Sequence, residues 1–130
     1  MVTDRVGDFI IRLKNAAAIK HATVSLPHSS ELSAIALKLR DLGYVSSVET
    51  EGKEKRTLTV ALAYDEAGNA KLHDVKRVSK PGRRLYATSR DAHNVKNGFG
   101  ARILSTSKGI LSDAEARKER VGGENLFEIW

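Results

Sequence analysis

Residues 22–49, ATVSLPHSSELSAIALKLRDLGYVSSVE, contain the signals for a strand, a helix and a second strand in immediate succession. The opening ATVSLP alternates apolar with small or polar side chains and stops at a proline, which predicts a short strand. Ser29 or Ser30 is placed to cap a helix that ends at Gly43, and the helix has an apolar face at spacings of three and four residues. This order of elements indicates a fold that mixes helices with antiparallel strands.

The residues on either side extend this pattern. Residues 4–18 carry an apolar stripe at helical spacing, and Thr3 or Asp4 can cap the helix that this stripe predicts. After Gly43, strands are predicted at 44–49 and 57–64, and the charged EGKEKR between them suits an exposed hairpin loop. The amino-terminal half is therefore predicted to be αβαββ.

The turn-rich DEAGNA at 65–70 is the one plausible boundary, because helical periodicity largely disappears beyond it. A short helix is predicted at 113–119, where Ser112 and Glu115 form a capping box. Short strands are predicted at 72–78, 85–88, 101–105 and 125–130, punctuated by Pro81-Gly82, Asn97-Gly98 and Gly122-Gly123. We expect an α+β fold of two small, closely packed subdomains: residues 1–64, a connecting turn at 65–70, and a mostly β subdomain at 71–130 with one short helix.

Positive charge is concentrated in the middle of the chain. The net charge is +6, and residues 71–108 contain ten Lys and Arg against two Asp, a local charge of +8 that leaves −2 for the rest. A surface that is merely solvated intersperses both signs. The distribution therefore favours a polyanionic partner.

Composition excludes several other classes of protein. The absence of cysteine removes disulfides, thiolate nucleophiles and cysteine-ligated zinc. The four histidines show no spacing typical of a helical metal site, so no metal and no cofactor are predicted. No apolar run reaches the ~20 residues that a membrane helix needs, and the start MVTDRVGDF has no apolar signal region. We expect a cytoplasmic protein with no membrane partner.

Residues 103–116, ILSTSKGILSDAEA, set three hydroxyl residues beside a lysine and a glycine. Ser105 and Lys108 match the Ser-x-x-Lys pattern of penicillin-recognising acyl enzymes, but the partner motifs Ser-Asp-Asn and Lys-Thr-Gly are absent. One remaining interpretation is a polar turn that leads into a helix. The other is recognition of RNA, whose 2′-hydroxyls, phosphates and base edges suit small hydroxyl side chains.

The basic turn VSKPGRRLY, residues 78–86, favours the second interpretation, because Tyr86 is available there to stack on a base or ribose. The Gly98-Phe99-Gly100 sequence is only a fragment of a dinucleotide fingerprint, so a turn is the better interpretation. Glu124 could be a general base. It is better explained as an acceptor for hydroxyls or amides of a neighbouring loop, since no other carboxylate or histidine is placed to share catalytic work.

At VKRVSKPGRRLY, ILSTSKG and VGGENLFEIW the chain closely resembles the bacterial type of ribosomal protein S8, the small-subunit family also called uS8. The likeness covers nearly the whole chain and includes TDRVGDFIIRLKNA, LPHSSEL, GYV and SDAEAR in the family's order. The resemblance implies a non-enzymatic, monomeric constituent of the small ribosomal subunit. Such a protein binds the central domain of the small-subunit ribosomal RNA directly, supports assembly early, and lies beside other small-subunit proteins.

The resemblance also implies which residues approach RNA. The main contact loop falls on Ser105, Thr106, Ser107 and Lys108, with Gly109 permitting the turn. Tyr86 and Glu124 lie beside the loop in the family, the first touching RNA and the second bracing the site, and the basic turn supplies Lys80, Arg83 and Arg84. Thr3, Asp4, Arg12 and Asn15 occupy places where the family approaches a second part of the same RNA helix.

Two departures bear on affinity. Arg5 stands where the family usually has proline, and Glu31 stands where it commonly has lysine, so we expect the carboxy-terminal half to carry most of the affinity. A second hypothesis is that the protein also or instead binds its own messenger RNA as a translational repressor, through a leader hairpin that imitates the ribosomal site. A small hydrolase is a distant third.

Overall fold

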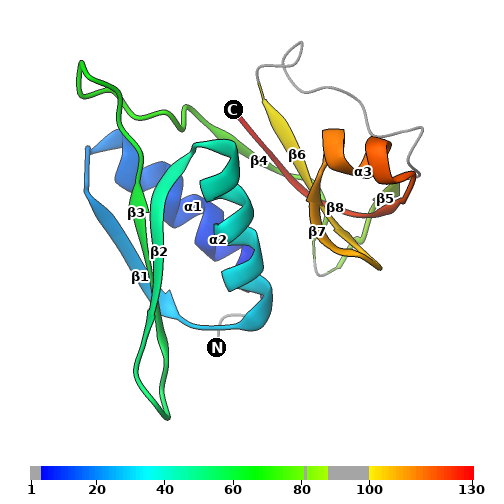
Figure 1. The fold of residues 1–130 in the computed structure, drawn as a ribbon, viewed down its shortest axis with the longest axis horizontal. Helices are drawn as coiled ribbons and strands as arrows, with labels where there is room; N and C mark the ends of the chain where they lie inside the picture. The colour runs from blue at the N-terminus through cyan, green and yellow to red at the C-terminus, as the bar shows by residue number, and fades with distance from the viewer. Residues whose placement is uncertain (1–3, 81, 88–99) are drawn as a thin grey trace. The chain divides into compact units, whose positions relative to one another are not determined.

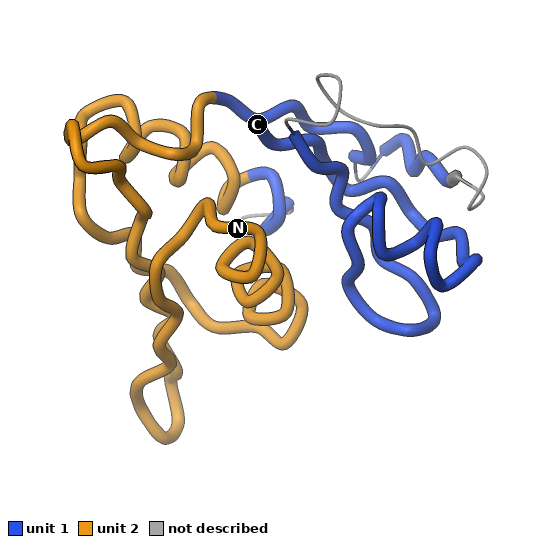
Figure 2. Tube along the Cα trace, turned by 45° about the horizontal axis from the view of Figure 1, so that its top comes forward, with its two compact units in different colours: residues 1–7, 74–130 blue, residues 8–73 orange. Residues whose placement is uncertain are grey.

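The structure is a computed structural model that describes residues 4–80, 82–87 and 100–130. The chain forms two compact units: residues 8–73 make one, and residues 1–7 together with 74–130 make the other (Figure 2). We call them the amino-terminal unit and the carboxy-terminal unit.

The amino-terminal unit consists of an antiparallel sheet with two helices on one of its faces (Figure 1). Strand β3 is central and pairs with β1 on one side and β2 on the other. The elements are α1 (Arg5–Ala18, which begins in the other unit), β1 (Thr23–Pro27), α2 (Ser30–Leu42), β2 (Val45–Glu51) and β3 (Thr57–Leu62).

The core of this unit lies between the sheet and the helices. Alternate residues of β3, including Leu58 and Val60, are fully buried, as are Phe9 of α1 and Leu39 of α2. The Ser29 side chain accepts a hydrogen bond from the amide of Leu32 at 3.1 Å and so caps α2, which ends at Gly43. The apolar spacing in the sequence therefore marks the buried faces.

The carboxy-terminal unit is mostly β structure. Its sheet has the order β4-β8-β6-β7, and the short β5 also pairs with β8, which is thus central. Ile103, Leu104, Phe127 and Ile129, from the two longest strands, are fully buried. The elements are β4 (Val75–Arg77), β5 (Tyr86–Ala87), β6 (Ala101–Thr106), β7 (Gly109–Ser112), α3 (Asp113–Glu119) and β8 (Gly123–Ile129).

The predicted α+β class is confirmed, with an αβαββ first half and a mostly β second half that has one short helix. The capping box of Ser112 and Glu115 is present at the start of α3. Strand β7 was not predicted, because residues 109–112 are few and lie directly between the hydroxyl turn and the helix cap. The Asn97-Gly98 turn lies outside the described residues, and the proposed boundary at 65–70 stays a prediction.

Candidate nucleic-acid interface

The hydroxyl run forms the tip of the β6–β7 hairpin. Thr106 pairs with Gly109, so Ser107 and Lys108 make the exposed turn between the strands. The Thr106 hydroxyl donates to the carbonyl oxygen of Gly109 at 2.7 Å and accepts from the amide of Lys108 at 3.1 Å. Gly109 has a φ of +105°, a value that L side chains rarely adopt. The turn is thus fixed by its own hydrogen bonds, and it presents Ser107 outward.

Three candidate residues lie side by side across three strands. Glu124 of β8 is directly opposite Tyr86 of β5 on one side and Ser105 of β6 on the other. Residues directly opposite one another in antiparallel strands point to the same face of a sheet. The Tyr86 ring is 72% exposed there. Tyr86, Glu124 and Ser105, which we call the central row, therefore form one patch with the hairpin tip beside it.

Glycine is required next to the central row. A Cβ on Gly123 would lie 2.2 Å from the carbonyl oxygen of Ser105, a distance at which one of the backbones must move. Strands β6 and β8 can approach this closely only because position 123 has no side chain. The glycine before Glu124 thus sets the spacing between that residue and Ser105.

The Glu124 carboxylate connects the central row to the basic turn. Its Oε2 accepts a hydrogen bond from the Ser79 hydroxyl at 2.5 Å and another from Arg84 Nη1 at 3.0 Å. Ser79 is completely buried, and its hydroxyl also accepts from the amide of Leu85 at 3.2 Å. The hydrogen bond and the negative charge of Glu124 raise the pKa of Arg84, which therefore stays cationic.

The described donors to Glu124 therefore come from the basic turn. One of them is the hydroxyl of Ser79, which agrees with the predicted role of Glu124 as an acceptor for a neighbouring loop, whereas the hydroxyl loop supplies no described donor. The loop does not need Glu124 as an acceptor, because Thr106 satisfies the turn internally. In the ladder between β6 and β8, Glu124 stands opposite Ser105.

The remaining cations of the turn are presented to solvent. Lys80 and Arg83 are exposed, and their backbones exchange two hydrogen bonds, at 3.0 and 2.9 Å, that close a tight turn. Pro81, within this turn, lies outside the described residues. Among the described contacts, neither side chain forms an ion pair, so both can meet phosphate groups without first breaking one.

Asp4 has a structural role at the start of α1. Its Oδ1 accepts from the amide of Gly7 at 3.0 Å, which caps the helix, and from Arg77 Nη2 at 2.8 Å. Arg77 also donates to the carbonyl oxygen of Leu126 at 2.9 Å and so ties this carboxylate to β8. A contact between Asp4 and RNA stays a prediction, and Thr3 lies outside the described residues.

Arg12 and Asn15 lie three residues apart on the exposed surface of α1, in the amino-terminal unit. Arg12 pairs with Asp8 at 3.0 Å and donates to the carbonyl oxygen of Ser25 at 3.4 Å. Both line a shallow groove between α1 and β1 that also includes the exposed Ile19. The two residues therefore offer polar groups on one surface, apart in the sequence from the central row.

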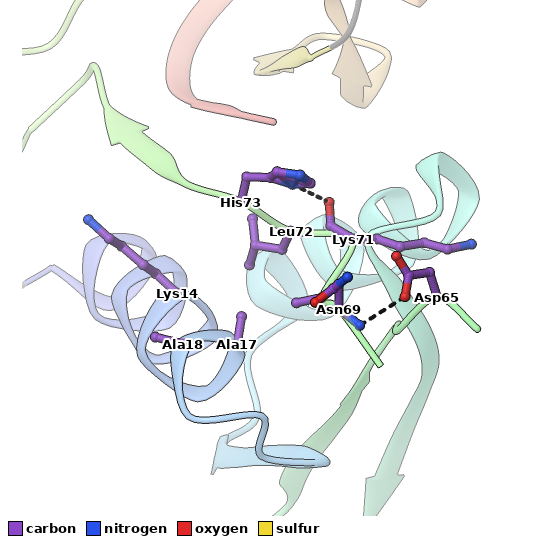
Figure 3. Close-up of a pocket in the computed structure, with 9 residues that line it drawn as sticks. Lys14, Ala17, Ala18, Asp65, Asn69, Lys71, Leu72 and His73 are labelled. Atoms are coloured by element: carbon purple, nitrogen blue, oxygen red, sulfur yellow. Dashed lines mark hydrogen bonds between the residues drawn. The ribbon is translucent and has the colours of Figure 1, made fainter. Parts of the chain in front are cut away.

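The same unit contains a larger open groove of about 690 Å³ between α1 and residues 65–73 (Figure 3). Lys14 contributes from α1, and Lys71 and His73 from the other wall. The Asp65 carboxylate accepts the amide of Asn69 at 2.8 Å, and His73 Nδ1 lies 3.3 Å from the carbonyl oxygen of Lys71. These polar groups serve the local turn, and the described residues of this groove include no serine, threonine or cysteine nucleophile for them to activate.

Two negative findings apply to the described part of the chain. None of its helices is long and apolar enough to cross a membrane. No group of three or more histidine, aspartate and glutamate side chains there is arranged to hold a metal ion.

Sequence reasoning missed two residues that organise this surface. Ser79 gave no signal, because one serine between a strand and a proline is common, and its burial depends on the pairing of β8. Glu119 was also not singled out, yet its Oε2 lies 3.2 Å from Lys108 Nζ. Ser79 is 45 positions from Glu124, and Glu119 is 11 positions from Lys108. No local sequence pattern therefore indicates either contact.

Together the fold and the interface define an α+β protein with a basic, hydroxyl-rich surface on its carboxy-terminal unit. The profile of the family described as ribosomal protein S8 matches residues 4–130. The chain belongs to this family, which is a family of ribosomal proteins and not of enzymes, so the prediction of a non-enzymatic protein is confirmed.

Its relatives match over their whole length. The small ribosomal subunit protein uS8 of Mycoplasmopsis synoviae is 45% identical over 99% of this chain and 98% of its own. The protein of the same name from Chloroflexus aurantiacus is 42% identical over 99% of this chain and 98% of its own. That of Nautilia profundicola is 40% identical over the full length of both chains.

Proposed function

We propose that this protein is a structural constituent of the small ribosomal subunit in the cytoplasm, and that it binds the central domain of the small-subunit ribosomal RNA directly. The observation that carries the proposal is the central row, which places an exposed aromatic ring, a carboxylate and a hydroxyl beside the tip of the β6–β7 hairpin. Basic side chains border this patch, as expected of a surface that meets a polyanion.

Each part of the surface has a chemical task on RNA. Ser105 and Ser107 can donate to and accept from 2′-hydroxyls and base edges, and Tyr86 can stack on an unpaired base. Lys80 and Arg83 attract phosphates without reading sequence. Because the hairpin is closed by its own hydrogen bonds, its hydroxyls are presented in a fixed geometry, which lowers the entropic cost of binding.

The carboxylate in the middle of the patch does not oppose this function. Arg84 and Ser79 both bond to Oε2 of Glu124, so its charge is balanced locally before any phosphate approaches. Its other oxygen is suited to accept from an RNA donor, such as a base amino group. A phosphate oxygen could not satisfy it, so Glu124 favours a base or ribose at this position.

The amino-terminal unit supplies a second, weaker contact. Arg12 and Asn15 are exposed together on α1 and can meet a phosphate and a ribose. Glu31, in the first turn of α2, is a negative charge on the same unit and reduces its attraction for RNA. Most of the affinity therefore comes from the carboxy-terminal unit.

The test is a binding titration with a transcript of the central domain of a bacterial small-subunit ribosomal RNA. A random-sequence RNA duplex of similar length serves as the comparison. We expect tighter binding to the central domain and, for ~4 to 6 phosphate contacts, a log-log salt slope of about −4 to −5. Equal affinity for both RNAs, or a flat salt response, would contradict the proposal.

Repression of its own messenger RNA would use the same surface, because a leader hairpin that imitates the ribosomal helix presents the same chemical groups. A transcript of the leader of the protein's own operon, added to the same titration, tests this second function. Competition between the leader and the central-domain transcript is the expected result if both occupy the central row.

A further inference from the structure

Lys108 at the tip of the hydroxyl hairpin is held by a carboxylate from the next helix. Its Nζ lies 3.2 Å from Oε2 of Glu119, the last residue of α3. The side chains are 53% and 48% exposed, so the pair is open to solvent and to an incoming phosphate. The cation at the tip of the hairpin is therefore already paired in the free protein.

Glu119 is unfavourable for α3 itself, for two reasons. It places negative charge in the last turn, where the helix dipole favours the cations that Arg117 and Lys118 provide. It also follows Glu115 by four residues, a spacing at which like charges repel. Both residues line the groove between the hairpin and α3, although the Glu115 carboxylate is held at the start of the helix, where its Oε1 accepts from the amide of Ser112 at 3.2 Å. The described contact that offsets this cost is the ion pair with Lys108.

We propose that Glu119 is a specificity-determining residue that weakens the attraction of Lys108 for RNA phosphates in general. This inference rests on the proposed function. Binding to arbitrary RNA is almost entirely electrostatic, so a lysine shared with a carboxylate contributes less to it. The hydroxyls of Ser105 and Ser107 form directional bonds that do not depend on a free lysine. Glu119 therefore lowers non-specific affinity more than affinity for the matching RNA.

The expected size of the effect is modest, because an exposed ion pair is readily broken. Removing the charge of Glu119 should raise affinity for a random duplex roughly two- to fivefold at low salt, the range that a surface pair can supply. The salt slope for that duplex should steepen by about 0.9, which corresponds to one additional phosphate contact. Affinity for the central-domain transcript should change less than twofold.

The experiment compares Glu119→Gln with Glu66→Gln in titrations of both RNAs over a range of salt. Glu66 is exposed in the turn of the amino-terminal unit, so its variant makes the same change in net charge away from Lys108. The gain on the random duplex should exceed that of Glu66→Gln and should vanish when Lys108→Ala is added. This pattern would support the inference.

Four results would overturn it. Glu119→Gln could match Glu66→Gln on both RNAs, which would mean that the pair has no influence on binding. It could strengthen binding to both RNAs equally or weaken the central-domain complex alone, in which case Glu119 does not restrain non-specific attraction. The gain could also persist without Lys108. The preference of the unaltered protein for the central domain is measured first. If it shows none, the proposed function itself fails, independently of the result for Glu119.

Discussion

Replacing Ser79 with alanine tests whether one buried hydroxyl organises the surface. The hydroxyl is completely buried, donates to Glu124 and accepts from the amide of Leu85. Its loss removes a bond to a charged group, worth about 1.5 to 3 kcal/mol, and leaves a backbone amide without its partner. We therefore expect Ser79→Ala to lower the free energy of unfolding by about 2 to 3 kcal/mol.

Urea unfolding measures this loss, and the fluorescence of Trp130 reports on the affected unit, because it is the only tryptophan of the chain and lies in the carboxy-terminal unit. With an m value of about 1 to 3 kcal/mol/M, the midpoint should fall by about 0.7 to 3 M. Ser47→Ala, at an exposed serine of β2, is the matched control and should leave the midpoint within ~0.3 M of its starting value, as surface substitutions usually do.

The same variant should also lower affinity for the central-domain transcript, although Ser79 is too buried to touch RNA. The reason is that Glu124 would lose one of its two described donors, and Arg84 and Tyr86 would then be held less firmly. Adding Glu124→Gln to Ser79→Ala should cost less than the sum of the single losses, since both act on one network. A midpoint equal to that of Ser47→Ala, or strictly additive losses, would refute this reasoning.

Three further predictions concern single residues. Gly109→Ala should lower the free energy of unfolding in urea by about 1 kcal/mol, because Gly109 has a positive φ. Gly82→Ala is the control and should not lower it, since a Cβ at either position meets no atom within 4 Å but Gly82 has no positive φ. Arg83→Ala should weaken binding to the central domain and to a random duplex by similar factors, because phosphate contacts carry no sequence information; a loss on one RNA alone would contradict this. Asp4→Asn should destabilise the protein by about 1 to 2 kcal/mol through loss of the charged contact with Arg77, because asparagine can still cap the helix, and the ratio of the two RNA affinities should be unchanged. A changed ratio in the titration would instead indicate that Asp4 contacts RNA.

The elements that sequence predicted well are those fixed by short-range physics. The cap at Ser29 and the capping box at Ser112 each join residues three positions apart, so the chain itself determines them. The helices α1 and α2 followed from apolar spacing for the same reason. The hydroxyl run forms a polar turn with Ser107 and Lys108 at its exposed tip, but it leads first into β7 and only then into α3.

The contacts that sequence could not predict join distant parts of the chain. Ser79 reaches Glu124 across 45 positions, and Arg77 reaches Asp4 across 73. Both depend on β8 lying in the middle of its sheet, which short strands with weak periodicity do not reveal. The missed strand β7 has the same origin, since its four residues acquire strand geometry from pairing with β6. The strand propensity of a residue says little about its structure where strand register and sheet order determine which residues it contacts.

On the proposed function, the two carboxylates of this basic surface have a common effect. Glu124 pairs with Arg84 and Glu119 with Lys108, so each removes one cation from unselective attraction while Lys80 and Arg83 remain available to phosphates. Attraction to any RNA helix then depends on the basic turn, and preference for one helix depends on the fixed hydroxyls and the central row. Because different residues carry these two properties, variants of Arg83 should lower affinity for both RNAs without changing preference. Variants of Ser107 should lower affinity for the central domain and leave affinity for a random duplex nearly unchanged.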